Sequence, residues 1–292
     1  MPASSVNRIF PVLATILTLL AFASETTGRA DDGFRDDART KADFESRLGS
    51  IFESGGIPTG SETMKQLALE KMGPISLPLV SSTVSTPTTA YERARLATLI
   101  LGHLYLCGKC DKYHANLAGG VIISPDGLAL TNYHVLDNRE AIVFGAMTTE
   151  GQVFAIDEVL ASSKKDDIAL IRLSGAKNLP FVALTATVAT GDEVFVFSHP
   201  DGFFHSFTKG YLSRKYLTPN EKTPRLQITA DFARGSSGAG IFNDGGRLVG
   251  LATSTNSIYY EKEAGTPGHL QMVIKSGVPI STISKWFSET PQ

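Results

Sequence analysis

The sequence predicts an all-β domain, a barrel or a sandwich, preceded by an N-terminal extension that is partly helical. From about Ala97 onward, short runs of β-forming residues are broken at close intervals by turn-forming residues, which is typical of such folds. Over residues 225–231 polar and apolar side chains alternate, as they do in a half-buried strand. With 292 residues, 42% of them hydrophobic, the chain can bury a substantial core in one or two domains.

The predicted strands fall into two sets, and a short helix is expected to close the chain. The first set comprises residues 97–106, 117–124, 127–132, 141–147, 152–160 and 168–173. The second set comprises residues 182–184, 193–198, 206–216, 225–231, 238–243, 248–254 and 270–276. After Pro279, residues 280–287 are expected to form the closing helix.

The first residues are typical of a secretory signal. Arg8 precedes an uncharged stretch over residues 9–23, with small residues at Ala21 and Ala23, and cleavage is expected after Ala23. The alternative, a membrane anchor, is disfavoured because about 15 apolar residues are fewer than the ~20 that a spanning helix needs. The mature protein is therefore expected to be exported, periplasmic or secreted, without stable insertion into a membrane.

Residues 24–93 form the predicted extension. Apolar residues at helical spacing predict two short helices, around residues 44–52 and 64–68. Residues 76–89 are rich in Ser, Thr and Pro and are expected to form a linker or an extended arm. The sequence leaves open whether the extension is a removable pro-segment, a partner-docking tail or an oligomerisation element that would assemble a homo-oligomer.

The charge composition argues against one class of partner. The chain has 27 Lys and Arg against 29 Asp and Glu, for a net charge of −2. Neither the total nor any local tract shows the basic excess that nucleic-acid binding requires. No nucleic acid is therefore expected as a partner.

Three residues in the order His, Asp, Ser have the flanking sequences that nucleophilic catalysis requires. Ser237 lies in a Gly-Ser-Ser-Gly turn, His134 ends one predicted strand, and Asp167 begins a strongly apolar one. A serine hydroxyl is a weak nucleophile, so it needs a neighbouring base and a group that orients this base. Amides of the turn can stabilise the charge that develops on a carbonyl oxygen. Ser236 and Asp166 are the nearest alternatives, and the register of the flanking residues favours Ser237 and Asp167.

These segments resemble the trypsin-like (chymotrypsin-fold) serine peptidases. The matching motifs are Leu-Thr-Asn-Tyr-His-Val around His134, Asp-Ile-Ala-Leu-Ile from Asp167, and Gly-Ser-Ser-Gly around Ser237. The resemblance implies two six-stranded antiparallel β-barrels with the active site in the cleft between them. His134 would be the general base, Asp167 its orienting partner and Ser237 the nucleophile. The backbone amides of Gly235 and Ser237 would form the oxyanion hole.

The resemblance covers about residues 95–288 and is closest to the bacterial HtrA-type branch. Residues 198–202 are similar to the loop before a strand in that branch, and residues 273–280 to its strand-to-helix ending. The peptide-binding PDZ module that usually follows is not expected, because the chain stops at Gln292. The implied layout is a signal peptide (1–23), an extension (24–93) and a protease domain (94–288), whose barrels span about residues 94–175 and 180–277.

The implied function is that of an exported serine endopeptidase. It would hydrolyse peptide bonds in protein or peptide substrates through an acyl-enzyme, without a metal or organic cofactor. One alternative is that the fold serves as a catalytically latent or inactive module that binds peptides or acts like a chaperone. Another is a thiol–disulfide protein that uses Cys107 and Cys110.

Four residues are candidates for substrate binding. Asp231 precedes Ser237 by six residues, the spacing at which trypsin places the acid that selects Lys or Arg. The HtrA-type branch carries an aspartate near this point without that preference. Thr253, Ser254 and Thr255 would form the opposite wall of the pocket, and they lack the glycine that leaves room for a long side chain.

Both cysteines of the chain lie in one short segment with two histidines. Cys107 and Cys110 stand in a Cys-Gly-Lys-Cys run between His103 and His114. A disulfide is the favoured interpretation, because an exported protein folds in an oxidising environment. A zinc site with the two histidines is an alternative, and redox chemistry is a third.

Overall fold

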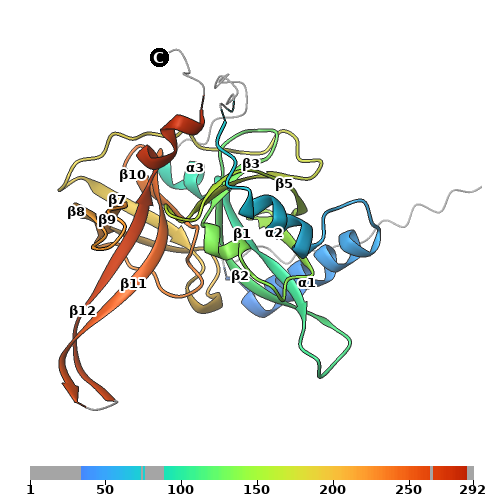
Figure 1. Ribbon diagram of the computed structural model, residues 1–292, viewed down its shortest axis with the longest axis horizontal. Coiled ribbons are helices and arrows are strands. Elements are labelled where there is room, and N and C mark those ends of the chain that lie inside the picture. The colour runs from blue at the N-terminus through green and yellow to red at the C-terminus, as the bar shows by residue number, and fades with distance from the viewer. Residues whose placement is uncertain (1–33, 74, 76–88, 264–265, 288–292) are drawn as a thin grey trace, which may run out of the picture. The chain divides into compact units, whose positions relative to one another are not determined.

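The computed structural model describes residues 34–73, 75, 89–263 and 266–287. The predicted signal peptide and all but the last residue of the predicted linker lie outside these residues. The described residues from Asp36 onward form one compact unit, whose elements are shown in Figure 1. None of the described helices combines the length and the apolar character needed to span a membrane.

The first of two barrels is built from the strands that follow the N-terminal helices. All neighbouring strands are antiparallel, and the order β1-β2-β3-β6-β5-β4 closes on itself. The strands are β1 (Thr98–Leu106), β2 (Tyr113–Ile122), β3 (Leu128–Thr131), β4 (Val143–Thr148), β5 (Val153–Ser163) and β6 (Ile168–Leu173).

The second barrel is also antiparallel and closes in the order β10-β11-β12-β9-β8-β7. The prediction of an all-β fold with two six-stranded barrels is thereby confirmed. The strands are β7 (Glu193–Ser198), β8 (Ser206–Leu217), β9 (Pro224–Ile228), β10 (Gly240–Asn243), β11 (Leu248–Glu263) and β12 (Thr266–Pro279).

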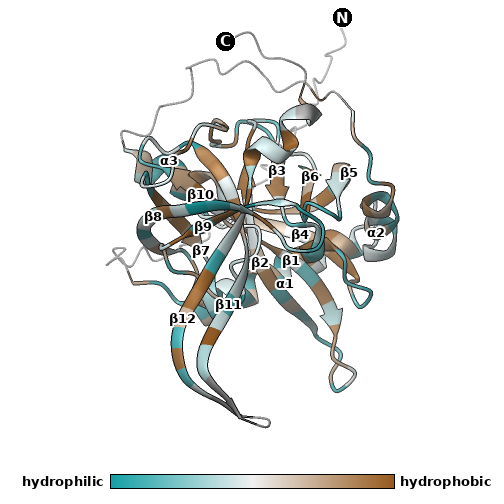
Figure 2. Ribbon diagram, turned by 60° about the vertical axis from the view of Figure 1, so that its left-hand side comes forward, coloured by the Kyte–Doolittle hydropathy of each residue, from teal (hydrophilic) through white to brown (hydrophobic). Residues whose placement is uncertain are grey.

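Two predictions for the second half were wrong in detail. Residues 182–184 do not form a strand, because only Leu184 makes an isolated bridge, to Leu248. β11 and β12 are longer than predicted and pair with each other almost throughout, so that they project from the barrel as a two-stranded ribbon (Figure 1). Hydrophilic and hydrophobic residues both occur along this ribbon (Figure 2), and the resulting lack of a clear apolar pattern explains why its length was underestimated.

The closing helix is a 3-10 helix, η2 (Ile280–Trp286), rather than an α-helix. Its buried side chains are Ile280, Ile283 and Trp286. They recur every third residue, which matches the three residues per turn of a 3-10 helix.

Helix α1 (Asp37–Glu53) packs against the first barrel. It begins at the N-cap Asp36, whose carboxylate accepts a hydrogen bond from the Arg39 N–H. Phe44 and Leu48 are completely buried in a cluster with Ile100 and other residues of the barrel. Leu99 and Leu101 on the same strand belong to a different core cluster, so β1 is covered on both faces, and this explains its mostly apolar sequence.

Two further helices frame the domain. α2 (Gly60–Ala68) begins with a capping box between Thr59 and Glu62 and buries Leu67 in the main core. α3 (Ala90–Ala97) was missed from the sequence. Its capping box, Thr89 with Glu92, was the available signal. The remaining short helices are α4 (Tyr133–Leu136) and η1 (Pro200–Gly202).

Candidate active site

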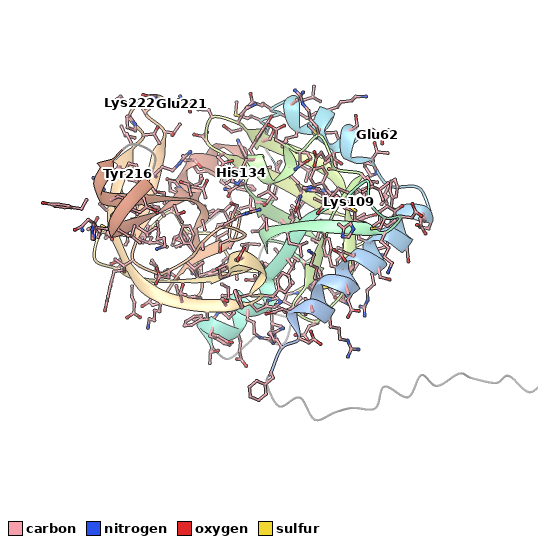
Figure 3. All side chains as sticks on the ribbon, turned by 90° about the horizontal axis from the view of Figure 1, so that it is seen from below. Glu62, Lys109, His134, Tyr216, Glu221 and Lys222 are labelled. Atoms are coloured by element: carbon pink, nitrogen blue, oxygen red, sulfur yellow. The ribbon has the colours of Figure 1, made fainter. Side chains whose placement is uncertain are left out.

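His134 lies in α4, a single helical turn that directly follows β3. Its side chain is half exposed, whereas the neighbouring Tyr133 and Val135 are buried. The two buried neighbours anchor the turn and leave the imidazole accessible. In Figure 3, His134 lies where the green strands of the first barrel meet the orange strands of the second.

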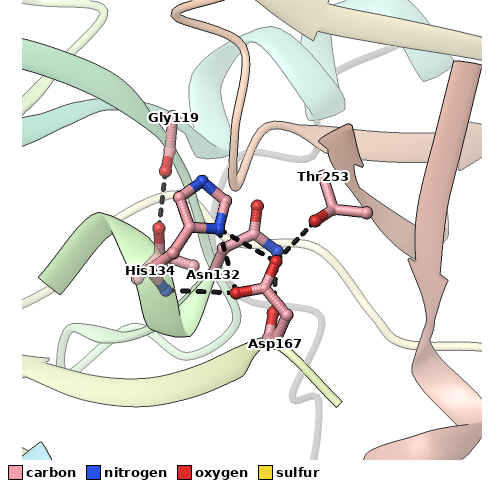
Figure 4. A network of polar contacts seen from close by, with 6 residues as sticks. Gly119, Asn132, His134, Asp167 and Thr253 are labelled. Atoms are coloured by element: carbon pink, nitrogen blue, oxygen red, sulfur yellow. Dashed lines mark hydrogen bonds and ion pairs between the residues drawn. The ribbon is translucent and has the colours of Figure 1, made fainter. Parts of the chain in front are cut away.

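Asp167 immediately precedes β6 and faces His134 (Figure 4). His134 Nδ1 lies 2.9 Å from both carboxylate oxygens of Asp167, and the backbone N–H of His134 donates to Oδ1 at 3.1 Å. Because an ionised carboxylate only accepts hydrogen bonds, this contact requires the proton on Nδ1. Nε2 is then left as the acceptor that a general base needs.

Two further side chains hold Asp167, and neither was predicted to do so. The Thr253 hydroxyl donates to Asp167 Oδ2 at 2.5 Å, and the Asn132 amide donates to the Asp167 backbone carbonyl at 2.9 Å. Thr253 comes from β11, so the contact joins the second barrel to the first. The sequence instead makes Thr253 a candidate for the substrate pocket. No local signal marks its contact with Asp167, because 86 residues separate the two.

Ser237 lies in the turn before β10 and is partly exposed. Its backbone carbonyl accepts a hydrogen bond from the Gly119 N–H at 2.7 Å, and the next residue, Gly238, donates to the Ala252 carbonyl at 2.9 Å. The turn is thus held between β2 and β11. Ser236, the alternative nucleophile, is 0% exposed, so its hydroxyl cannot meet a substrate in this conformation.

The backbone around Gly235 directs amides out of the turn. The Arg234 carbonyl accepts a hydrogen bond from the Asp201 N–H at 2.7 Å. The chain has no cis peptide bond among its described residues, and the C=O and N–H of a trans peptide point in opposite directions. The N–H of Gly235 therefore points away from Asp201. In the part of the chain that the structure describes, the N–H groups of Gly235 and Ser237 have no hydrogen-bond partner.

The structure does not join all three predicted catalytic side chains. Within the described residues no hydrogen bond links the Ser237 hydroxyl to the His134 imidazole. Catalytic hydrogen bonds are often long in unliganded enzymes and shorten when substrate binds. Asp166, the alternative carboxylate, accepts from the Ser163 hydroxyl at 2.9 Å. Within the described residues it forms no hydrogen bond or ion pair with His134.

A model of a known protein family matches a region that spans much of both barrels. Residues 118–251 match the model of the trypsin-like peptidase domain. These residues, which include His134, Asp167 and Ser237, are thus similar to a trypsin-like peptidase domain.

The curated relatives of this chain are named as serine endoproteases. A "Probable periplasmic serine endoprotease DegP-like" from Pseudomonas savastanoi pv. phaseolicola is 33% identical over 167 residues, which cover 55% of this chain and 33% of the relative. "Serine endoprotease DegS" from Escherichia coli K12 is 27% identical over 196 residues, which cover 64% of this chain and 54% of the relative. The chain therefore spans only a third to about half of the length of these relatives.

Solved structures extend the comparison of the fold. The structure "HtrA-type protease AlgW with decapeptide" superposes with a TM-score of 0.54 at 21% identity, covering 67% of this chain and 64% of that one. "HtrA-type protease AlgW with tripeptide" gives a TM-score of 0.53 at 24% identity, covering 66% of this chain and 60% of that one. At these identities the likeness concerns the fold alone.

Asp231, the candidate specificity residue, forms an ion pair with Lys275 in the structure. Lys275 Nζ lies 2.8 Å from Asp231 Oδ1. The lysine side chain is 11% exposed and the aspartate side chain 80%, so Asp231 supplies the charge that the largely buried ammonium needs. Lys275 is the only charged residue between Leu270 and Pro279. A lone charge in such a strand is a sequence signal for an internal ion pair. Ser254 and Thr255 are exposed on β11.

The predicted disulfide is not present in the structure. Cys107 and Cys110 are free and exposed, with their sulfur atoms 3.5 Å apart. A disulfide needs an S–S separation of about 2.05 Å. Instead, the turn holds Cys107 Sγ against the Lys109 N–H and Cys110 Sγ 3.2 Å from His114 Nε2. The Lys109 N–H, followed by Cys110, lowers the pKa of the Cys107 thiol to about 7.

Proposed function

We propose that this chain is an exported serine endopeptidase in which residues 94–288 form the catalytic domain. His134 acts as the general base, Asp167 orients it, and Ser237 is the nucleophile. The amides of Gly235 and Ser237 bind the oxyanion. Protein or peptide chains are the substrates.

The reaction follows from the chemistry of these groups. His134 Nε2 takes the proton from Ser237 as the hydroxyl oxygen attacks the scissile carbonyl carbon, and the negative charge moves to the carbonyl oxygen. Each oxyanion donor is worth roughly 3–4 kcal/mol in related systems. The imidazolium then gives its proton to the leaving amine, and an acyl-enzyme remains. Water, activated by the same imidazole, releases the acyl product and restores Ser237.

The observation that carries this proposal is the His134–Asp167 pair. Its 2.9 Å contacts impose one tautomer, in which the exposed Nε2 is a base. A histidine and an aspartate paired only for stability would not need a half-exposed imidazole. Gly235 and Ser237 supply two unpartnered amides in the turn that also carries the candidate nucleophile.

Export is proposed on the sequence of the first 23 residues. Export agrees with the name of the Pseudomonas relative, which describes that protein as periplasmic. Mass spectrometry of the protein recovered from the cell envelope tests this step. A mature N-terminus at Ser24 supports export with cleavage, and an intact Met1 in the cytoplasm contradicts it.

One observation favours a second function, that of a latent or inactive peptide-binding module. The Ser237 hydroxyl has no hydrogen bond to His134 in the described structure, so the resting nucleophile is not yet activated. In this case the same cleft would hold a peptide without cleaving it.

Labelling with a fluorophosphonate probe separates the two functions. The probe phosphonylates a serine only where a base and an oxyanion hole are assembled. We expect wild type to gain one adduct by intact mass and Ser237→Ala to gain none. Ser236→Ala is the matched control, because Ser236 is buried in the same turn and its loss should leave labelling intact. A folded wild type that is not labelled, yet binds peptides, would establish the latent module instead.

A further inference from the structure

A cluster of potential metal ligands lies at the tip of the β1–β2 hairpin. Cys107, Cys110 and His114 bring two thiol sulfurs and one imidazole nitrogen within 4.8 Å of one another. The sulfur atoms are 3.5 Å apart, and Cys110 Sγ lies 3.2 Å from His114 Nε2. In Figure 3, Lys109, in the same turn, is well separated from His134, so the catalytic proposal does not use this cluster.

The separations suit a shared tetrahedral ion. Zinc binds thiolate sulfur at about 2.3 Å and imidazole nitrogen at about 2.0–2.1 Å, so the edges of its tetrahedron are roughly 3.8 Å between sulfurs and roughly 3.5 Å between sulfur and nitrogen. The observed distances of 3.5 Å and 3.2 Å fall a few tenths of an ångström short of these edges. Rotation of the exposed cysteine side chains is enough to admit the ion.

The hairpin fixes the position of the histidine. The pairing of β1 with β2 continues to the end of the hairpin, with Tyr105 opposite His114 and Leu106 opposite Tyr113. The ring of His114 packs on that of Tyr105, with centroids 5.7 Å apart. Tyr113 in turn lies close to Gly49 of α1. His114 is therefore held by the strands, while the turn places both cysteines.

His103, a ligand in the zinc alternative raised by the sequence, does not belong to the cluster. Its Nε2 lies 3.4 Å from the Asn116 side-chain amide, and its ring packs edge-on against Phe144 at 5.4 Å. The side chain is buried. A four-ligand protein site with both histidines is thus excluded in this conformation.

We propose that Cys107, Cys110 and His114 bind one zinc ion and leave a fourth position to water. Thiolate and imidazole ligands select zinc and similar ions over magnesium or calcium, which prefer oxygen. The ion would join the turn to β2 across the end of the hairpin. The proposal is independent of the proteolytic function, because none of its ligands is assigned to the catalytic site.

The test is metal binding by the purified full-length mature protein. The protein is reduced, freed of metal and titrated with Zn²⁺ against a chromophoric chelator, and separately with Co²⁺. We expect one zinc per chain and a cobalt spectrum with thiolate charge-transfer and intense tetrahedral ligand-field bands. Cys107→Ser, Cys110→Ser and His114→Gln should each weaken zinc binding by about tenfold or more.

His103→Gln is the matched control, because it removes the other histidine of the same hairpin and should leave zinc affinity unchanged. Circular dichroism of each variant checks that the fold is retained. We expect it to be retained in the cysteine variants, because both cysteines are exposed. Absence of saturable zinc binding by the reduced wild type would overturn the proposal. An oxygen-only cobalt spectrum, or a zinc affinity equal to that of wild type in all three ligand variants, would overturn it as well.

Discussion

Thr253 donates a 2.5 Å hydrogen bond to Oδ2 of Asp167, the oxygen that also lies 2.9 Å from His134 Nδ1. The donor stands on β11 of the second barrel and the acceptor at the start of β6 in the first. The carboxylate is therefore held from both sides of the junction between the barrels, and the orientation of the imidazole depends on how the barrels meet.

Thr253→Val tests this contact. Valine keeps the shape of threonine but cannot donate, so the carboxylate loses one charge-assisted hydrogen bond and orients His134 less firmly. We expect the rate of fluorophosphonate labelling to fall about tenfold, equivalent to about 1.4 kcal/mol. Thr253→Ser retains the hydroxyl and should restore most of the rate. Thr187→Val, a change at an exposed threonine outside the strands, is the control, and equal rates in both valine variants would contradict the role of Thr253.

Gly235→Ala tests the oxyanion turn. Gly235 has a φ of +91°, and a Cβ there would lie 2.6 Å from the His199 carbonyl oxygen, so the turn must shift and carry its amides with it. We expect labelling to slow by about 100-fold. Gly191→Ala is matched, because Gly191 has a φ of +95° but a Cβ there would meet nothing within 4 Å. Similar slowing in both variants would mean that backbone strain alone, rather than displacement of the amides, is responsible.

Lys275→Met tests the specificity of the pocket. With Lys275 at 2.8 Å, Asp231 is neutralised, so wild type should prefer an uncharged residue before the cleaved bond. Without the ammonium, Asp231 can attract a cationic side chain. We expect the ratio of kcat/KM for Lys over Val substrates to rise roughly tenfold, since a charge contact near a surface is worth on the order of 1 kcal/mol or more.

Lys209→Met controls for the loss of one positive charge, because Lys209 pairs with Glu193 on the neighbouring strands β8 and β7. The substrate ratio should not change in this variant. If the ratio is equally insensitive to Lys275→Met, Asp231 does not face the substrate.

His103 should make the stability of the protein depend on pH. Burial lowers its pKa to about 4 from 6.5, so the folded state keeps the imidazole neutral while the unfolded chain takes up a proton. Stability is therefore lost as pH falls below about 6.5, and the loss levels off near pH 4. From pH 7 to pH 5 the contribution is up to about 2 kcal/mol. Urea unfolding at both pH values should show a smaller loss for His103→Gln than for wild type, and an equal loss would refute this account.

Phe44→Ala tests whether α1 belongs to the folded domain. Phe44 is completely buried and packs against the first barrel. Removal of such a ring lowers the free energy of unfolding by about 3–5 kcal/mol. We expect the free energy of unfolding to fall by this amount in urea titrations. Leu69→Ala, at a side chain that is 63% exposed, should change it by less than about 0.5 kcal/mol. A loosely attached extension would instead leave both variants as stable as wild type.

Much of the fold could be read from local patterns. The strands of the first barrel follow from apolar runs and turn residues, and the helices α1 and α2 from apolar spacing. The errors occur where pairing or packing overrides the pattern. The ribbon of β11 and β12 is stabilised by its own pairing. The closing helix was predicted, and packing decided only its type, because the three-residue period of η2 buries Ile280, Ile283 and Trp286.

The sequence by itself determined which residues are candidates for chemistry, because nucleophile, base and carboxylate each lie in a recognisable local setting. Only the tertiary structure decided which of these candidates interact. It paired Asp231 with Lys275, separated His103 from the cysteines, and brought Thr253 to Asp167. Such contacts depend on how strands distant in sequence are brought together within and between the barrels. A local sequence pattern carries no information on distances across that junction.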